Sequence, residues 1–170
     1  MTAGARLWLR IVLPITTAPL LLAALSPSVP TERVPLFLQP AVGAVAGCLL
    51  FVVLTRRPPS VGARSASLGV LAARWGILGL LATNEELLWR RIAFGELLFG
   101  GAAAALAATT VGFALAHRGR PGPHLLSGGM FGGLYAATGG LTTSIVAHWV
   151  YNLNVRSAIA EPARRTRDAR

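Results

Sequence analysis

Apolar residues occur in long runs along the chain, and short breaks rich in arginine, proline or glycine separate these runs. Most of the runs approach the roughly 20 residues that an α-helix needs to cross a bilayer. The pattern therefore predicts an all-α fold, a polytopic transmembrane helical bundle of about six spans. The runs cover residues 7–25, 35–54, 67–83, 97–117, 125–138 and 141–160.

The breaks between the runs are short, and we expect a single integral membrane domain over residues 1–170. The stretch 56–66 (RRPPSVGARSA) is the clearest linker because it combines arginine with proline, serine and glycine. The first run is interpreted as a retained, kinked helix rather than a signal peptide, since no small-residue cleavage site follows it. The polar, basic tail at 161–170 is expected to be frayed.

Composition supports a membrane protein. Hydrophobic residues make up 54% of the chain and charged residues only 13%, with a mean hydropathy of +0.59. An average soluble domain carries about 25% charged residues, so an ordinary soluble globule and a disordered chain are both excluded. We expect an integral membrane protein, in a bacterial-type cytoplasmic (inner) membrane.

The charges are strongly basic, with a net charge of +10. All 16 basic residues are arginine, and most of them lie in the gaps between apolar runs. This distribution favours topology signals and contacts with anionic lipid headgroups over nucleic-acid binding. It predicts that both termini are on the cytoplasmic side, together with Arg6, Arg56, Arg57, Arg64, Arg118, Arg120, Arg164, Arg165, Arg167 and Arg170. Cys48 is the single cysteine and is interpreted as a small buried apolar residue.

Two adjacent acids, Glu85 and Glu86, interrupt an otherwise apolar stretch. Ionisable groups inside apolar helices are functional candidates by default. Glu86 and Arg90 have i, i+4 spacing with the acid first, which favours an ion pair. Glu85 points about 100° away around the helix and does not share that partner, which makes it a candidate general base.

Two further helices carry polar pairs at the same spacing. Phe113 and His117 share one helix face, and His148 and Asn152 share another. Other interpretations exist for each signal alone: an interfacial charge cluster around residues 85–91, and hydrogen bonds between helices for His148 and Asn152. His124 is expected to be a surface residue in a turn.

Taken in order, EExxxR at 85–90, FxxxH at 113–117 and HxxxN at 148–152 make the chain resemble the CPBP family. These are intramembrane endopeptidases related to the type II CAAX prenyl endopeptidase and to bacteriocin-processing and immunity proteins. The resemblance places a catalytic core at about residues 70–155. It implies hydrolysis of a peptide bond in a membrane-anchored protein or peptide.

The resemblance also implies roles for the motif residues. Glu85 would activate the attacking water with the help of His117, and His148 and Asn152 would stabilise the oxyanion. Glu86, Arg90 and Phe113 would order the site. We expect no cofactor; the alternative is a metal-assisted mechanism in which Glu85, His117 and His148 bind zinc. Arg91 departs from the family pattern, which often has glycine at that place.

Two other functions are consistent with the same residues. A non-catalytic membrane partner, such as an immunity or scaffold protein of this family, would use them for helix packing. A proton-coupled transporter would use buried Glu and His side chains as a relay, although the small number of predicted spans and the lack of an inverted repeat count against it.

Overall fold

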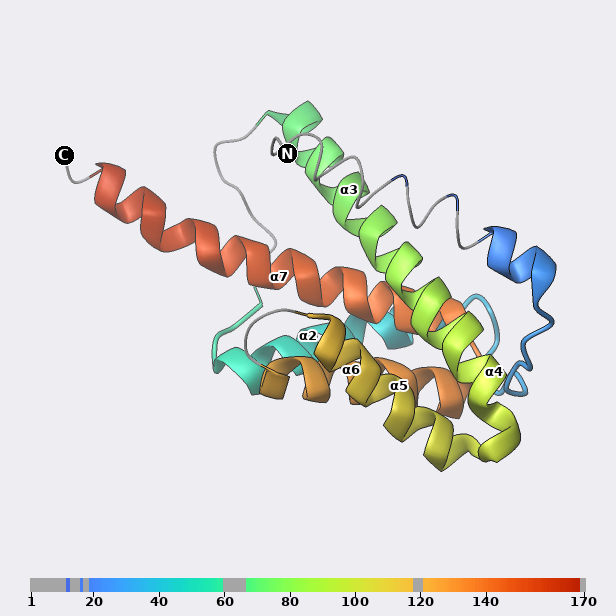
Figure 1. Ribbon diagram of the computed structural model, residues 1–170. Coiled ribbons are helices and arrows are strands. Elements are labelled where there is room, and N and C mark those ends of the chain that lie inside the picture. The colour runs from blue at the N-terminus through green and yellow to red at the C-terminus, as the bar shows by residue number, and fades with distance from the viewer. Residues whose placement is uncertain (1–11, 13–15, 17–18, 60–66, 118–120, 169–170) are drawn as a thin grey trace.

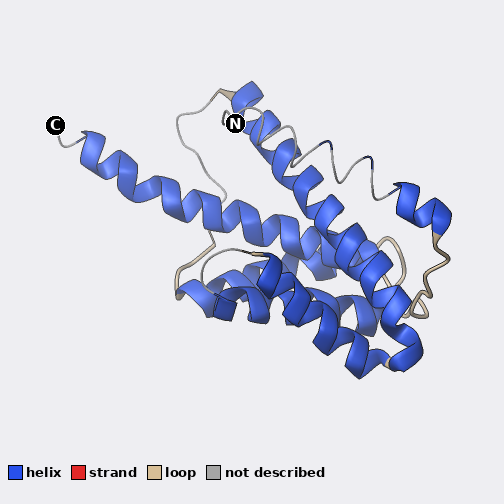
Figure 2. Cartoon of the chain, in the orientation of Figure 1, coloured by secondary structure: helices blue, strands red, loops and turns tan. Residues whose placement is uncertain are grey.

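The computed structural model describes residues 12, 16, 19–59, 67–117 and 121–168, with side chains described as far as residue 159 at the C-terminal end. All regular structure within these ranges is helical, which confirms the predicted all-α class (Figure 2). A short helical stretch at 19–24 precedes the main bundle. The five longer helices are α2 (Gln39–Thr55), α3 (Leu68–Glu86), α5 (Ala102–Ala116), α6 (Pro121–Thr138) and α7 (Leu141–Asp168).

Helix α7 is the element around which the others pack. It runs across the molecule in Figure 1 and contacts α2, α3 and α6, while α5 packs beside α6. Small residues allow α2 to approach α7 closely. A Cβ atom at Gly43 would overlap the carbonyl oxygen of Thr143, and one at Gly47 would overlap that of Ala147.

A tryptophan holds α3 against α7. Trp149 on α7 donates its indole N–H to the carbonyl oxygen of Trp75 on α3, at 3.0 Å. Gly79, one turn further along α3, leaves room for the same indole ring. This contact sets the distance between the helix that carries Glu85 and Glu86 and the helix that carries His148.

Helix α3 does not end at its charged residues. It continues directly as a π-helix, η1 (Leu87–Phe94), then as the short α4 (Gly95–Leu97) and the 3₁₀ turn η2 (Leu98–Gly100). Gly101 follows with φ +94°, a conformation that favours glycine. The predicted end of the third run at 83 and start of the fourth at 97 were therefore wrong, because one helical path continues from Leu68 to Gly100 before α5 begins at Ala102.

The boundaries of the last two helices also differ from the prediction. Helix α6 starts at Pro121 rather than at 125, because proline is tolerated in a first turn, where backbone N–H groups have no partner within the helix. Helix α7 begins at Leu141 as predicted, but its backbone stays helical to Asp168, through most of the tail expected to be frayed.

The predicted membrane spans are not found. None of the helices in the described ranges is both long enough and apolar enough to cross a bilayer. The most apolar helices, α2 and α5, have 17 and 15 residues, and α3 contains Arg74 together with the two glutamates. Most of the first predicted run, and the topology-signal arginines 6, 64, 118, 120 and 170, lie outside the described residues.

Candidate active site

Glu86 is a fully buried carboxylate at the end of α3 and accepts three hydrogen bonds. Its Oε2 atom lies 3.1 Å from Arg90 Nε and also accepts from the hydroxyl of Ser144. Its Oε1 atom lies 2.9 Å from His148 Nδ1. The predicted Glu86–Arg90 ion pair is thus present, and it is completed by two donors from α7. A buried carboxylate needs this compensation because desolvation disfavours its charge.

Arg90 connects this buried centre to α5 and α6. Its side chain is fully buried, and its second nitrogen, Nη2, donates to the carbonyl oxygen of Gly128 on α6 at 3.0 Å. Its guanidinium carbon lies 5.4 Å from the centre of the Phe113 ring on α5, within range of a cation–π interaction. One side chain from η1 therefore holds two further helices in place around the site.

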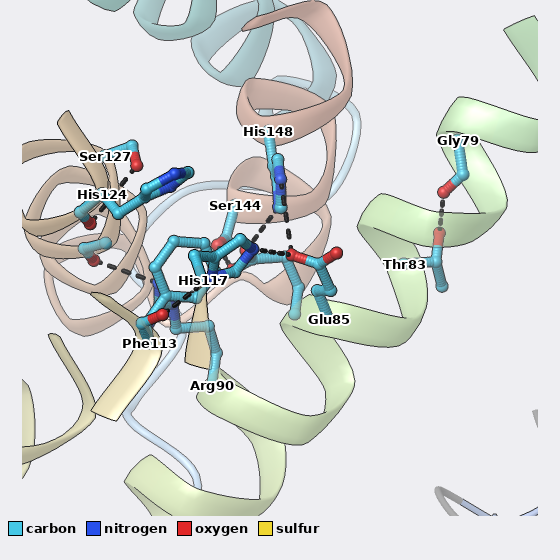
Figure 3. Close-up of polar contacts among 12 residues, drawn as sticks. Gly79, Thr83, Glu85, Arg90, Phe113, His117, His124, Ser127, Ser144 and His148 are labelled. Carbon is cyan, nitrogen blue, oxygen red and sulfur yellow. Dashed lines mark hydrogen bonds and ion pairs between the residues drawn. The ribbon is translucent and has the colours of Figure 1, made fainter. Parts of the chain in front are cut away.

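Glu85 lies on another face of the same helix and has a different environment. About 35% of its side chain is exposed, whereas Glu86 has none exposed. Its Oε2 atom lies 3.4 Å from His117 Nε2 and 3.8 Å from His148 Nε2 (Figure 3). Helices α3 and α7 and the residue that follows α5 thus bring one carboxylate and two imidazoles together, and the Glu85 side chain as a whole remains partly exposed.

The hydrogen bonds of the two histidines determine which ring nitrogen faces Glu85. His117 Nδ1 lies 2.7 Å from the carbonyl oxygen of Phe113, and a carbonyl only accepts, so Nδ1 carries a hydrogen. His148 Nδ1 donates in the same way to Glu86. Both Nε2 atoms therefore face Glu85. A carboxylate and a bare imidazole nitrogen are both acceptors, so a hydrogen on His117 Nε2 makes its contact with Glu85 favourable.

Asn152 is the one motif residue that makes no polar contact with the other motif residues in the described structure. It lies one helical turn beyond His148 on α7 and is half-buried. Within the described part of the chain, no hydrogen bond or ion pair involves its side chain. The structure brings together the remaining motif residues, namely Glu85, Glu86, Arg90, Phe113, His117 and His148.

Three residues at the site were not singled out from the sequence. Ser144, which bonds Glu86, lies one turn before His148, and a hydroxyl at that spacing on an apolar helix is the signal that would have found it. Phe131 stacks on His148, and His124 stacks on His117. The expectation that His124 is a surface residue was wrong: it lies on α6, is half-buried and contacts the site.

Arg91, the departure from the family pattern, does not enter this site. Its guanidinium donates to the carbonyl oxygen of Pro27 at 2.7 Å. No ion pair joins it to Glu85 or Glu86 in the described structure. A bulky charge is accommodated at this place because the segment before α2 supplies an acceptor for it.

Among the described residues, no group of three or more His, Cys, Asp or Glu side chains has an arrangement that could hold a metal ion. The zinc ligands considered from the sequence, Glu85, His117 and His148, are therefore near one another without forming such a group.

A helical bundle that buries one carboxylate and directs a second toward two imidazoles has the acid–base groups of a hydrolase. The family model described as type II CAAX prenyl endopeptidase Rce1-like matches residues 66–154, just over half of the chain and every motif residue. The chain belongs to this family, which confirms the resemblance seen in the sequence and points to a protease. No curated protein and no solved structure matches the chain.

Proposed function

We propose that the protein is an endopeptidase that acts at the membrane and hydrolyses a peptide bond of a membrane-associated protein or peptide. Family membership supports the reaction class and a membrane location, because the family consists of membrane proteases. The observation that carries the proposal is the convergence of His117 Nε2 and His148 Nε2 on one oxygen of the half-exposed Glu85. Acid–base groups in this arrangement are able to handle the protons of peptide hydrolysis.

In the proposed reaction, Glu85 takes a proton from a water molecule while the water oxygen attacks the carbonyl carbon of the peptide. His117 gives the proton on its Nε2 atom to the leaving nitrogen as the C–N bond breaks, and the proton on Glu85 then returns to His117. Asn152 and the imidazolium form of His148, which carries a hydrogen on Nε2 as well as on Nδ1, donate hydrogen bonds to the oxyanion that develops on the carbonyl oxygen. During this reaction, His148 Nδ1–H stays bonded to Glu86, which keeps its Nε2 atom directed at the reacting atoms.

We further propose that the reaction does not depend on a metal, because the described side chains offer no metal-binding group and Asn152 suits oxyanion stabilisation better than zinc binding. If this is correct, dialysis against a strong chelator leaves the rate of cleavage by the purified protein unchanged. Loss of cleavage that added zinc restores would contradict the metal-independent mechanism. It would leave the proposal of an endopeptidase intact.

The decisive experiment compares the wild-type protein with the Glu85→Gln variant, expressed at matched levels in the native host. The termini of all membrane proteins are then measured by mass spectrometry. Terminal peptides produced by the wild type should fall by about 10²-fold or more in the variant, the usual contribution of a general base. Glu96→Gln is the matched control, because Glu96 is an exposed carboxylate on α4, outside the site.

The same experiment decides between proteolysis and a non-catalytic role. Terminal peptides that disappear only in the Glu85→Gln variant establish proteolysis and identify the substrate. Identical termini in all three strains, with each protein folded, contradict the proposal and favour a membrane partner such as an immunity or scaffold protein.

A further inference from the structure

Helix α6 supplies no residue of the three sequence motifs, yet it places a ring against each histidine of the site. The ring of His124 stacks on His117 with 4.5 Å between centroids and 21° between planes. The ring of Phe131 stacks on His148 with 4.7 Å between centroids and 18° between planes. Both contacts are nearly parallel, in contrast to the edge-on contact of Phe113 with His148 at 75°.

The spacing along α6 explains how one helix makes both contacts. Residues 124 and 131 are seven positions apart, which is about two helical turns, so both side chains lie on the same face. Gly128 lies between them, and its carbonyl oxygen accepts a hydrogen bond from the buried Arg90. A Cβ atom at Gly128 would come within 3.0 Å of the Phe113 ring, so the absence of a side chain lets α6 approach α5.

Stacking supplies a constraint that the hydrogen bonds of the site lack. Each histidine is held at Nδ1 by one acceptor, Phe113 O for His117 and Glu86 for His148. The Nε2 atoms of His117 and His148 also lie 3.4 Å and 3.8 Å from Glu85, which is longer than an ordinary hydrogen bond, and the Phe113 ring lies 4.3 Å from the His117 ring at 39°. None of these contacts is a parallel stack on the imidazole face, and the second side-chain torsion of histidine is broad, so they restrain the ring plane only weakly. A ring stacked on the imidazole face fixes the ring plane, and Nδ1 and the plane together determine the direction of Nε2.

We propose that His124 and Phe131 are positioning residues, and that α6 acts as an aromatic template that directs both Nε2 atoms at Glu85. The role in catalysis rests on the proposed endopeptidase function, whereas the orientation of the two imidazoles is a property of the folded protein. Phe131 is 1% exposed and also packs in the core with Leu50 and Ala147, so its loss alone would weaken the fold. The test therefore needs a readout other than stability.

The chain has three histidines, so a protein labelled at the histidine Cε1 carbon gives three proton–carbon signals. These can be recorded in detergent on protein purified with a tag that contains no histidine, and assigned with single histidine variants. Removing the stacked ring in Phe131→Leu should move the His148 signal downfield, because the ring current is lost. His124→Leu should do the same to the His117 signal, and His124→Phe should keep that signal near its wild-type position.

Activity is measured on the same variants as the rate at which Glu85-dependent products appear. We expect losses of about 10-fold or more for His124→Leu and Phe131→Leu, since a misplacement of about 1 Å can cost about 10²-fold. His124→Phe, which keeps the ring, should restore most of the rate. Phe51→Leu is the control for stability: Phe51 is an equally buried ring on α2, outside the site, so its loss should weaken the fold while leaving the rate nearly unchanged.

The outcomes separate this inference from the proposed function. Signals of His117 and His148 that stay in place in the leucine variants overturn the stacking, and shifted signals with unchanged cleavage rates overturn the positioning role. If the wild type itself cleaves nothing while the signals shift as expected, the proposed function has failed and the catalytic role of α6 fails with it. Shifted signals, slower cleavage and recovery in His124→Phe together support the template.

Discussion

At the scale of single residues, two adjacent glutamates have opposite environments. Glu86 is fully buried and accepts bonds from Arg90, Ser144 and His148, whereas Glu85 is 35% exposed and faces two Nε2 atoms. The difference arises because neighbours on a helix point about 100° apart. One carboxylate is therefore enclosed by its donors, while the other, which we propose as the general base, remains partly exposed.

The first residue-scale prediction concerns the donors of Glu86. Arg90→Ala removes the cation from a fully buried pair, and it should lower the free energy of unfolding by about 3–5 kcal/mol. Ser144→Ala removes a neutral donor from the same carboxylate, so its loss should be smaller, about 1–3 kcal/mol. Chemical unfolding in detergent measures both. Normal stability of Arg90→Ala would contradict the structural role given to this pair.

At the scale of helices, the contact of α2 with α7 depends on residues that have no side chain. Gly43 and Gly47 lie one turn apart and face the carbonyl oxygens of Thr143 and Ala147. A close approach of two backbones yields many small van der Waals contacts, which are the main source of helix association in an apolar environment. The packing of α7, and with it the place of His148, follows from this contact.

The element-scale prediction uses a pair of glycine variants. Gly47→Ala places a Cβ atom against the α7 backbone and should destabilise the protein by about 1–3 kcal/mol, as overpacking does. Gly76→Ala is the matched control on α3, where a Cβ atom meets nothing within 4 Å. It should stabilise the protein by about 1 kcal/mol through helix propensity. Equal effects of the two changes on thermal unfolding would refute the close-packing argument.

At the scale of the whole molecule, the segment before α2, residues 27–33, contacts elements that are far apart in the sequence. Arg91 on η1 donates to Pro27, and the backbone N–H of Arg33 donates to Thr138 at the end of α6. Gly139, with φ +69°, lies so close to Thr31 that a Cβ atom would overlap its carbonyl oxygen. Arg91 therefore has a structural role in this chain, in place of the glycine that is common in the family pattern.

The molecule-scale prediction is that Arg91→Met releases this segment. Methionine keeps much of the side-chain length but loses the donor, so the Pro27 end of the segment is no longer held. Amide hydrogen exchange at Arg33 should become faster, because its bond to Thr138 opens more often. Exchange within α2 serves as the internal reference. Unchanged exchange at Arg33 would show that the Arg91 contact contributes nothing to holding the segment.

The sequence by itself determined the helical class and the family, and it named six residues that the structure brings together. Long apolar runs predict helices, and the i, i+4 spacing of Glu86 and Arg90 predicts their ion pair, because both depend only on local helix geometry. The same geometry separates Glu85 from Glu86. The gap between the predicted runs 67–83 and 97–117 was wrong because the charges along the chain do not reveal that α3 continues as a π-helix. The predicted membrane spans are not confirmed, since none of the described helices is long and apolar enough to cross a bilayer.

Only the tertiary structure decided which groups meet. The contact of Ser144 with Glu86 joins two helices that are far apart in the sequence. The contact of His124 with His117 joins α6 to the residue that follows α5. Such contacts depend on how α3, α5, α6 and α7 are rotated and spaced. Glycines at the helix contacts and the buried carboxylate of Glu86 determine that arrangement through packing, which no local sequence pattern reveals. The motifs named the side chains of the candidate site, and the packing of four helices determined the directions in which they point.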